Sequence, residues 1–450
     1  MTFATRLTSV NQTMNKNSPS GRHSPWAWVP TLYLYQGIPY SIVMTTSVLM
    51  YKNMDVDVAS FTFWTSLLYL PWTIKPLWSP IVESIGTKRR WIVLTQLIVA
   101  MAFAILAMSM QITSFYSVSL IMLAIIAFGS ASHDIACDGF YMLALPERQQ
   151  QFFVGIRTTF YRIAMLVALG GMPIVAGFFQ GGNLSADSVS STEIPIDVRA
   201  TSWTYAFLVL AAILAMLCII NYVTMPYPSS DGRSTWQGWR IFVDVVRSFF
   251  SKKGVVAAMA FLLLYRLGEA QLAKIATVFL VDSRANGGIA MDQIQYGFAY
   301  GSLGMVALTV GGIAGGWLAS RFGLRRVIWY MVAFMNLPNL VYVYLACFQP
   351  FATDVSVYVA IVIEQLGYGF GFTAYMLFIL HYVGTSRYRT AEYAIATAIM
   401  AIGMMLPGMI SGYMKELLGY EYFFIYVVVC CLPGTLIVPL LRLDESGYAQ

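Results

Sequence analysis

Long apolar segments recur along the whole chain, and this repetition constrains the fold more than any other feature. A helix needs about 20 consecutive, mostly apolar residues to cross the hydrocarbon core of a bilayer. The sequence predicts an all-α polytopic membrane protein with twelve transmembrane helices in two halves of six. The predicted spans lie near residues 26–50, 58–82, 91–110, 115–142, 152–180, 203–224, 254–281, 293–319, 325–347, 355–383, 389–414 and 421–441.

The composition agrees with a membrane protein and argues against a soluble one. Of the 450 residues, 58% are hydrophobic and 11% are charged, whereas soluble domains carry roughly 25% charged residues. A soluble protein with this sequence would have to bury about a dozen apolar helices in one core, beyond the size at which single cores stop growing. This excludes an ordinary soluble globular domain.

The basic residues give an orientation for the predicted spans. The short loops after spans 2, 4, 8 and 10 contain "GTKRRW", "PERQQQ", "RFGLRR" and "TSRYRT", and the opposite loops are mostly acidic. Because Lys and Arg accumulate in cytoplasmic loops, both termini are predicted to be cytoplasmic, with residues 1–25 and 442–450 as tails. The net charge of +6 is then explained by topology and does not indicate nucleic-acid binding.

A polar linker at residues 225–253 separates an N-terminal half, 26–224, from a C-terminal half, 254–441. Within it, "WQGWRIFVDVVRSFF" has the pattern of an amphipathic helix lying along the inner leaflet. Two six-span repeats are typical of the major facilitator fold, which we therefore predict.

Two equivalent loops indicate a cytoplasmic gate. "WSPIVESIGTKRR" follows span 2, and "GGWLASRFGLRR" follows span 8. Each combines a helix end rich in small residues, a glycine turn and basic residues that can cap helix carbonyls or pair with an acid. The predicted gate residues are Glu83, Arg89, Arg90, Arg321, Arg325 and Arg326.

Charged residues inside predicted spans are the main functional candidates, because a charge at mid-bilayer costs roughly 2.5–3.5 kcal/mol on insertion scales. They either form ion pairs between helices or line a polar cavity between the halves. Asp134 and Asp138 share one helix face, and two like charges in an apolar environment disfavour joint ionisation. One of them could therefore carry a proton, and the other could pair with Arg162. The predicted proton-coupling and cavity residues are Asp134, Asp138, Glu269 and Glu364.

Basic, aromatic and amide side chains in the same spans are the candidates for substrate binding. They suit a substrate with anionic groups, hydrogen-bonding groups and sugar faces. The predicted substrate-binding residues are Tyr35, Gln36, Lys75, Arg162, Tyr265, Arg266, Lys274, Gln365 and Tyr368.

No catalytic motif is evident. The five cysteines lack the spacing of a metal site or a disulfide framework. The sequence has only three histidines, no P-loop and no nucleophile elbow. We therefore expect neither an enzyme nor an ATP-driven pump, and no metal or cofactor.

The block "GSASHDIACDGFYMLALPERQQQ", followed by "GIRTTFYRIAML", resembles the AmpG muropeptide permeases. These belong to the peptide and acetyl-coenzyme A transporter branch of the major facilitator superfamily. Further similar segments are "GIPYS", "KPLWSP", "LYRLGEA" and "GYEYFFIYVV", so the resemblance covers nearly the whole chain.

The resemblance implies a bacterial inner-membrane permease that functions as a monomer. Its cargo would be N-acetylglucosaminyl-1,6-anhydro-N-acetylmuramyl peptides, imported by proton symport for peptidoglycan recycling. The expected partners are this sugar-peptide, protons and the lipid bilayer. Two alternatives stay open: a related permease for a peptide, a siderophore-like solute or an acyl-coenzyme A cargo, or an exporter of drugs or metabolites.

Overall fold

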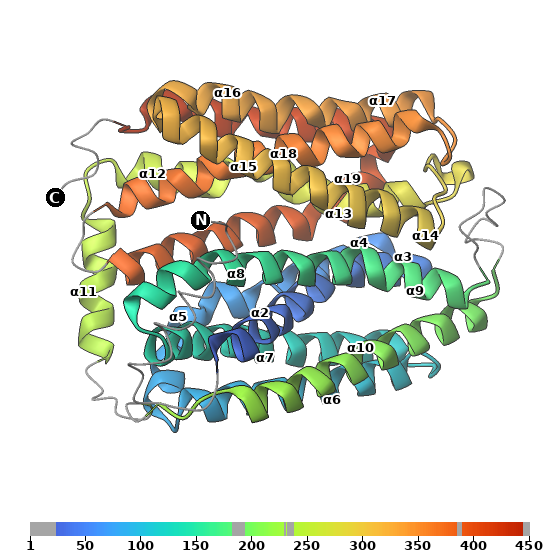
Figure 1. The fold of residues 1–450 in the computed structure, drawn as a ribbon. Helices are drawn as coiled ribbons and strands as arrows, with labels where there is room; N and C mark the ends of the chain where they lie inside the picture. Colours follow the sequence, from blue (N-terminus) through green and yellow to red (C-terminus); the bar gives the residue numbers. More distant parts are fainter. Residues whose placement is uncertain (1–23, 182–193, 229–230, 232–237, 385–388, 444–450) are drawn as a thin grey trace, which may run out of the picture.

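The chain folds into a bundle of long helices that lie side by side (Figure 1). The computed structural model describes residues 24–181, 194–228, 231, 238–384 and 389–443, and among these residues there is no β-strand. Within these ranges the side chains of Pro80, Glu83, Ser84, Glu147, Arg148, Gln151, 238–242 and 389–390 are not described.

The N-terminal half runs from α2 to α10. Two of its predicted spans, the first and the fifth, contain a short π-helical stretch. Its elements are α2 (Pro25–Ser41), η1 (Ile42–Thr46), α3 (Ser47–Asn53), α4 (Val58–Leu67), α5 (Leu70–Ser84), α6 (Lys88–Ser109), α7 (Phe115–Ala144), α8 (Glu147–Leu166), η2 (Val167–Gly171), α9 (Met172–Phe179) and α10 (Ile196–Thr224).

The C-terminal half runs from α12 to α19. Its elements are α12 (Val255–Leu264), α13 (Leu267–Val281), η4 (Arg284–Asn286), α14 (Gln293–Tyr296), η5 (Gly297–Gly304), α15 (Met305–Phe322), α16 (Leu324–Asn336), η6 (Leu337–Asn339), α17 (Leu340–Phe348), α18 (Val355–Val383), α19 (Arg389–Ile437) and η7 (Val438–Leu440).

Nine helices in the described part of the chain are long and apolar enough to cross a membrane. One of them covers 50 residues, Ala391–Leu440, and is broken at Gly419, whose φ of 68° and ψ of 176° are not helical. The predicted spans 389–414 and 421–441 leave a loop between them. In the structure this loop is a break at one residue, which glycine permits because it has no Cβ. Segments 25–53 and 58–84 are also helical over most of their length. The predicted count of twelve is consistent with this arrangement.

The linker contains the helix α11 (Gly238–Phe250), as its sequence pattern predicts. Figure 1 shows that α11 lies across one end of the bundle, called here the α11 end. Val245 and Phe249 are buried, whereas Val243, Asp244 and Arg247 are exposed. The opposite end, called the far end, carries the turn between α3 and α4 and the helix α14.

Local sequence signals explain where several helices begin and turn. Asp57 caps α4 by accepting a hydrogen bond from the backbone N–H of Ser60 at 2.7 Å, and Thr87 caps α6 by accepting one from Arg90 at 3.2 Å. Gly323, with φ 77°, makes the one-residue turn between α15 and α16. Short polar side chains therefore set the helix starts within the apolar sequence.

Large apolar side chains point outward over much of the bundle surface. A soluble protein would hide such side chains, but in a bilayer the lipid tails solvate them and the polar groups collect inside. Exposed examples from both halves are Leu97, Ile105, Ile219, Val306 and Ile313.

The two halves meet toward the far end. The π-helical stretches η2 and η5 approach so closely that a Cβ on Gly301 would lie 2.3 Å from the Cα of Gly170. A Cβ on Gly177 would lie 2.6 Å from the side chain of Ile294. Backbone contact at this density requires residues without side chains.

Candidate substrate and proton site

A first cluster of polar side chains lies in the N-terminal half around Asp134 of α7. The carboxylate of Asp134 lies 3.6 Å from the ammonium of Lys75, and the indole N–H of Trp72 donates to it at 3.3 Å. Tyr40 packs edge-on against Trp72, with ring centroids 5.2 Å apart. Gln36 of α2 is a further neighbour of Asp134. Asp134 is therefore held by α5 and α2 and has a cation beside it.

Asp138 lies one turn along α7, toward the α11 end, and has different partners. Arg157 of α8 donates to the Asp138 carboxylate at 3.1 Å, and the Tyr33 hydroxyl donates to it at 3.4 Å. The Arg157 guanidinium also lies 4.6 Å from the centre of the Tyr33 ring. The Asp138 side chain is 44% exposed, against 16% for Asp134. The less exposed Asp134 is therefore the stronger candidate for a proton-carrying group.

The expectation that one of these aspartates pairs with Arg162 is wrong. Asp134 pairs with Lys75 and Asp138 with Arg157. Arg162 instead donates to the hydroxyl of Thr309 on α15 at 2.9 Å. Arg162 therefore connects the N-terminal half to the C-terminal half.

A second cluster lies in the C-terminal half around Arg266, between α12 and α13. Arg266 donates to the hydroxyl of Tyr368 on α18 and lies 5.0 Å from the ring centre of Phe372. Its φ of −105° and ψ of 17° interrupt the helix, and α13 begins directly after it. Glu269 is buried, and its Oε2 has no hydrogen-bond partner among the described residues.

Glu364 of α18 is also buried, and the amide of the adjacent Gln365 donates to it at 2.9 Å. Tyr300 of η5 has both Glu364 and Glu269 as electrostatic neighbours. The C-terminal half therefore brings together two carboxylates, a guanidinium and aromatic hydroxyls in a buried position.

The two clusters adjoin each other across the interface between the halves. Tyr40 has Asp134 on one side and Arg266 on the other as charged neighbours, and Tyr69 is also a neighbour of Arg266. Polar groups thus continue from Lys75 and Asp134 through tyrosines to Arg266. We call this connected set the central site; it contains Tyr40, Tyr69, Trp72, Lys75, Asp134, Arg266, Glu269, Tyr300, Glu364, Gln365 and Tyr368.

Lys274 of α13 is buried and crosses to the N-terminal half. Its ammonium donates to the carbonyl oxygen of Met44 at 3.0 Å and to the hydroxyl of Thr65 at 3.1 Å. An ammonium buried without a carboxylate is costly unless its donors are satisfied. This geometry gives Lys274 a contact between the halves, in addition to its predicted role with substrate.

Two predicted substrate-binding tyrosines lie in the core. The Tyr35 hydroxyl donates to the carbonyl of Gln96 at 2.7 Å, and the ring packs on His133. The Tyr265 hydroxyl donates to the carbonyl of Gly371 at 3.0 Å, and its ring stacks on Tyr375. Both side chains are almost fully buried. Their hydrogen bonds to backbone carbonyls make them packing residues in this structure.

The predicted gate residues lie at the α11 end. Arg89 donates to the carbonyl of Tyr222 in its own half and lies 3.8 Å from the ring centre of Tyr227 in the linker. Arg321 lies over Trp317 of its own helix. Arg90, Arg325 and Arg326 are exposed, and the side chain of Glu83 lies outside the described residues. Their role as a gate stays a prediction.

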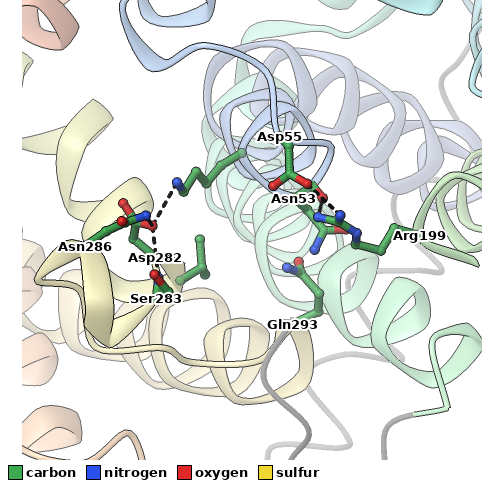
Figure 2. Close-up of a pocket in the computed structure, with 9 residues that line it drawn as sticks. Asn53, Asp55, Arg199, Asp282, Ser283, Asn286 and Gln293 are labelled. Atoms are coloured by element: carbon green, nitrogen blue, oxygen red, sulfur yellow. Dashed lines mark hydrogen bonds and ion pairs between the residues drawn. The ribbon is translucent and has the colours of Figure 1, made fainter. Parts of the chain in front are cut away.

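A polar pocket at the far end was not predicted from the sequence. It has a volume of about 60 Å³ and lies between the two halves (Figure 2). Lys52 pairs with Asp282 at 2.9 Å across the interface, and Arg199 pairs with Asp55 at 2.6 Å within the N-terminal half. The pocket lining consists of Lys52, Asn53, Asp55, Arg199, Val281, Asp282, Ser283, Asn286 and Gln293. The only sequence signal was the position of these residues next to loops that we predicted to face away from the cytoplasm.

The central site has the chemistry of solute binding and proton exchange. Lys75 and Arg266 can bind anionic groups, tyrosine and tryptophan rings can pack against sugars, and buried carboxylates can exchange protons. The described residues contain no group of three or more His, Cys, Asp or Glu side chains able to hold a metal ion.

Comparison with known proteins gives the family. Residues 31–391 match the Major Facilitator Superfamily. The chain is 25% identical over 415 residues to the "Anhydromuropeptide permease" of Escherichia coli K12, covering 90% of this chain and 77% of the relative. It is 22% identical over 432 residues to "Putative transporter AmpG 4" of Rickettsia conorii, covering 91% and 95%. These relatives are transporters, not enzymes.

Solved structures agree on the fold. The nucleoside transporter NupG superposes with a TM-score of 0.67 at 16% identity, covering 91% of this chain and 98% of that one. A D-xylose–proton symporter superposes with a TM-score of 0.67 at 10% identity, covering 93% and 97%. The predicted major facilitator fold and the resemblance to AmpG permeases are therefore confirmed. The chain belongs to the Major Facilitator Superfamily, as a multi-pass membrane transporter similar to the AmpG permeases.

Proposed function

We propose that the chain imports anhydro-muropeptides across the bacterial inner membrane by proton symport with alternating access, for peptidoglycan recycling. The similarity to an anhydromuropeptide permease over 90% of the chain supports this cargo class. As in the sequence-based expectation, the transporter functions as a monomer.

The observation that carries the proposal is the composition of the central site. A sugar-peptide presents carboxylates, amides and the apolar faces of pyranose rings. Lys75 and Arg266 provide cations for the carboxylates, and Tyr40, Trp72 and Tyr368 provide rings beside them. Stacking of sugars on aromatic faces combines apolar burial with a defined orientation. The cargo would therefore bridge the two halves.

Proton coupling requires a carboxylate whose protonation changes as the site alternates between the two sides of the membrane. Asp134 beside Lys75 is the candidate in the N-terminal half, and the buried Glu269 and Glu364 are the candidates in the C-terminal half. A proton on any of them lowers the cost of carrying the charge through an apolar environment.

The orientation in the proposal rests on the basic residues at the α11 end, such as Arg90 and Arg325, which favour the cytoplasmic side. The far end would then face the periplasm. With this orientation, the contacts between η2 and η5 and the pair Lys52–Asp282 would close the central site toward the periplasm.

The test is uptake of labelled anhydro-muropeptide into inverted and right-side-out vesicles, with and without a proton gradient. The proposal expects saturable uptake in both preparations, with accumulation of cargo only when the proton gradient is directed into the vesicle. Absence of saturable uptake of any cell-wall fragment would contradict the cargo. Saturable uptake that is the same with and without the proton gradient would contradict the proton symport.

A further inference from the structure

The far-end pocket contains buried polar groups that its own residues do not satisfy. Both polar atoms of the Gln293 side chain, the Nδ2 of Asn53 and the Nε of Arg199 have no hydrogen-bond partner among the described residues. These residues are 1%, 3% and 6% exposed, respectively. Figure 2 shows the amide of Gln293 directed toward Asn53 and Arg199. Burying polar groups without hydrogen-bond partners is unfavourable, so this arrangement indicates a ligand that supplies hydrogen bonds.

The lining restricts the charge of such a ligand. Lys52 and Arg199 are each paired with a carboxylate, those of Asp282 and Asp55. The pocket is therefore balanced, with two positive and two negative groups. A carboxylate or an ammonium entering it would lose hydration without gaining a free counter-charge. A neutral polar group fits better.

The pattern of donors and acceptors restricts the ligand further. The Gln293 amide presents a donor and an acceptor side by side, which matches the acceptor and donor of a second amide. Asn53 and Arg199 add two more donors to the lining, and either of them can fill the second lone pair of the carbonyl oxygen of that amide. A hydroxyl group has one oxygen and cannot bridge both atoms of Gln293 in the same way.

The volume restricts the size. One water needs roughly 10–15 Å³ of such space, so a pocket of about 60 Å³ has room for about four heavy atoms. Acetamide has this size. The Asp55 side chain is 58% exposed, so the pocket is reachable from the far end.

We propose that the far-end pocket is a binding subsite for a neutral amide of acetamide size, formed jointly by Asn53 and Arg199 of one half and Gln293 of the other. A group bound there contacts α3, α10 and α14 at once. Because the subsite exists only while the far ends of the halves are together, an amide in it stabilises the closed far end.

The subsite goes beyond the proposed cargo, because the acetamido groups of an amino sugar are trans secondary amides, whose N–H and carbonyl lie on opposite edges and cannot both bond Gln293. The ligand that fits is a primary amide. The binding experiment below uses acetamide and no cargo. Its outcome is therefore independent of the transport experiment, and failure of one does not imply failure of the other.

The experiment is saturation-transfer NMR on the full chain in nanodiscs, observing the methyl protons of acetamide up to about 100 mM, since so few atoms bind with millimolar affinity. Wild-type protein should give a saturable signal. Gln293→Met, which keeps the side-chain length, should reduce it at least fivefold. Gln111→Met is the matched control, because Gln111 is exposed outside the pocket, and it should leave the signal unchanged.

Acetate and N,N-dimethylacetamide test whether the ligand must be neutral and must carry an N–H donor. Acetate lacks a donor and carries a charge, and N,N-dimethylacetamide lacks a donor, so both should give at most a fifth of the acetamide signal. Gln293→Glu, which loses the amide donor but not the size, should also lose acetamide binding. Three outcomes would each overturn the proposal. Acetate could give a signal equal to that of acetamide, acetamide could give equal signals in wild type and Gln293→Glu, or wild type could give no saturable signal.

Discussion

The ammonium of Lys52 lies 2.9 Å from the carboxylate of Asp282 and joins the end of α3 to the end of α13. The Tyr420 hydroxyl donates to the same carboxylate at 2.6 Å, and the Asn286 amide donates at 3.0 Å. Burial opposes the charge of Asp282, but the Tyr420 hydroxyl and Lys52 outweigh it, so the pKa of Asp282 lies below its usual value. The carboxylate therefore stays ionised while the far ends are together.

This predicts how closure of the far end depends on pH. A carboxylate with a lowered pKa stabilises the closed state above its free pKa, about 3.9, and the contribution is lost as the pH falls through the lower closed-state value. The contribution of Asp282 to closure should therefore be constant between pH 8 and 5, and any pH dependence of the closed population in this range should be the same in wild type and in Asp282→Asn. The closed population is measured by double electron–electron resonance. The spin labels are attached at Ile112 and Phe351 in a variant without the native cysteines.

Asp282→Asn should separate the far ends at every pH in this range, because Lys52 loses its counter-charge. Asp197→Asn is the control, since Asp197 is an exposed acid at the same end. The prediction is contradicted if the closed population of wild type changes between pH 8 and 5 and that of Asp282→Asn stays constant. That result would show that Asp282 titrates in this pH range.

Asp134→Asn should abolish gradient-driven accumulation, with a loss of at least about tenfold, while exchange of labelled for unlabelled cargo continues. The amide keeps the hydrogen bond from Trp72 but cannot release a proton. Vesicle uptake and counterflow assays distinguish the two activities. Asp244→Asn, an exposed site on α11, is the control. If Asp134→Asn accumulates cargo with wild-type pH dependence, the proton is carried elsewhere.

Lys274→Met should separate the far ends, because two hydrogen bonds from a charged donor to Met44 and Thr65 are lost. Bonds of this type contribute about 1.5–3 kcal/mol each, which predicts a fall of tenfold or more in the ratio of closed to open states. The spin-label pair at Ile112 and Phe351 measures this. Thr65→Val removes one bond and should have a smaller effect. A raised KM with an unchanged closed population would assign Lys274 to substrate alone.

Gly301→Ala should prevent η2 and η5 from meeting. The added Cβ would lie 2.2 Å from the carbonyl oxygen of Leu169 and 2.3 Å from the Cα of Gly170, and backbone atoms cannot move aside as a side chain can. We expect transport to fall by about tenfold or more. Gly155→Ala is a matched control, since a Cβ there would meet no atom within 4 Å. Wild-type transport by Gly301→Ala would show that this contact is not required.

Glu392→Ala should destabilise the C-terminal half. Glu392 pairs with Lys252 at 2.6 Å, and both side chains are almost fully buried. Removing one partner of a buried pair costs about 3–5 kcal/mol because the other charge is left uncompensated. Thermal unfolding in detergent measures the loss. The double variant Lys252→Met/Glu392→Met should lose less thermal stability than Glu392→Ala, because it leaves no unpaired charge. Lys253→Met, at an exposed neighbour, should behave as wild type. A Tm of Glu392→Ala equal to that of wild type would contradict the prediction.

The helices were the most predictable part of the molecule. The span expected at 355–383 is observed as α18 (Val355–Val383), and the one expected at 115–142 as α7 (Phe115–Ala144). The bilayer explains this accuracy, since every backbone polar group in it must be satisfied within a helix. Apolar length then predicts which segments form helices, and polar caps and glycines set where they begin and break.

The partners of the charged residues were much less predictable. The sequence indicated that Asp134 and Asp138 occupy one face of α7, but not that Lys75 and Arg157 would meet them. Tyr35 and Tyr265 lie in spans rich in candidate residues, yet both donate to backbone carbonyls in the core. Helix rotation decides such cases, and a single sequence carries little information about it.

The sequence by itself determined the membrane-spanning helices, the two halves and the presence of charges within them, because apolar length and the cost of burying charge are local properties of the chain. Only the tertiary structure decided that Lys274 reaches Met44 across the halves, and that Gln293 and Asn53 share a pocket 240 positions apart in the chain. Contacts of that range depend on how helices pack against each other, and packing is set by the shapes of all neighbouring side chains together.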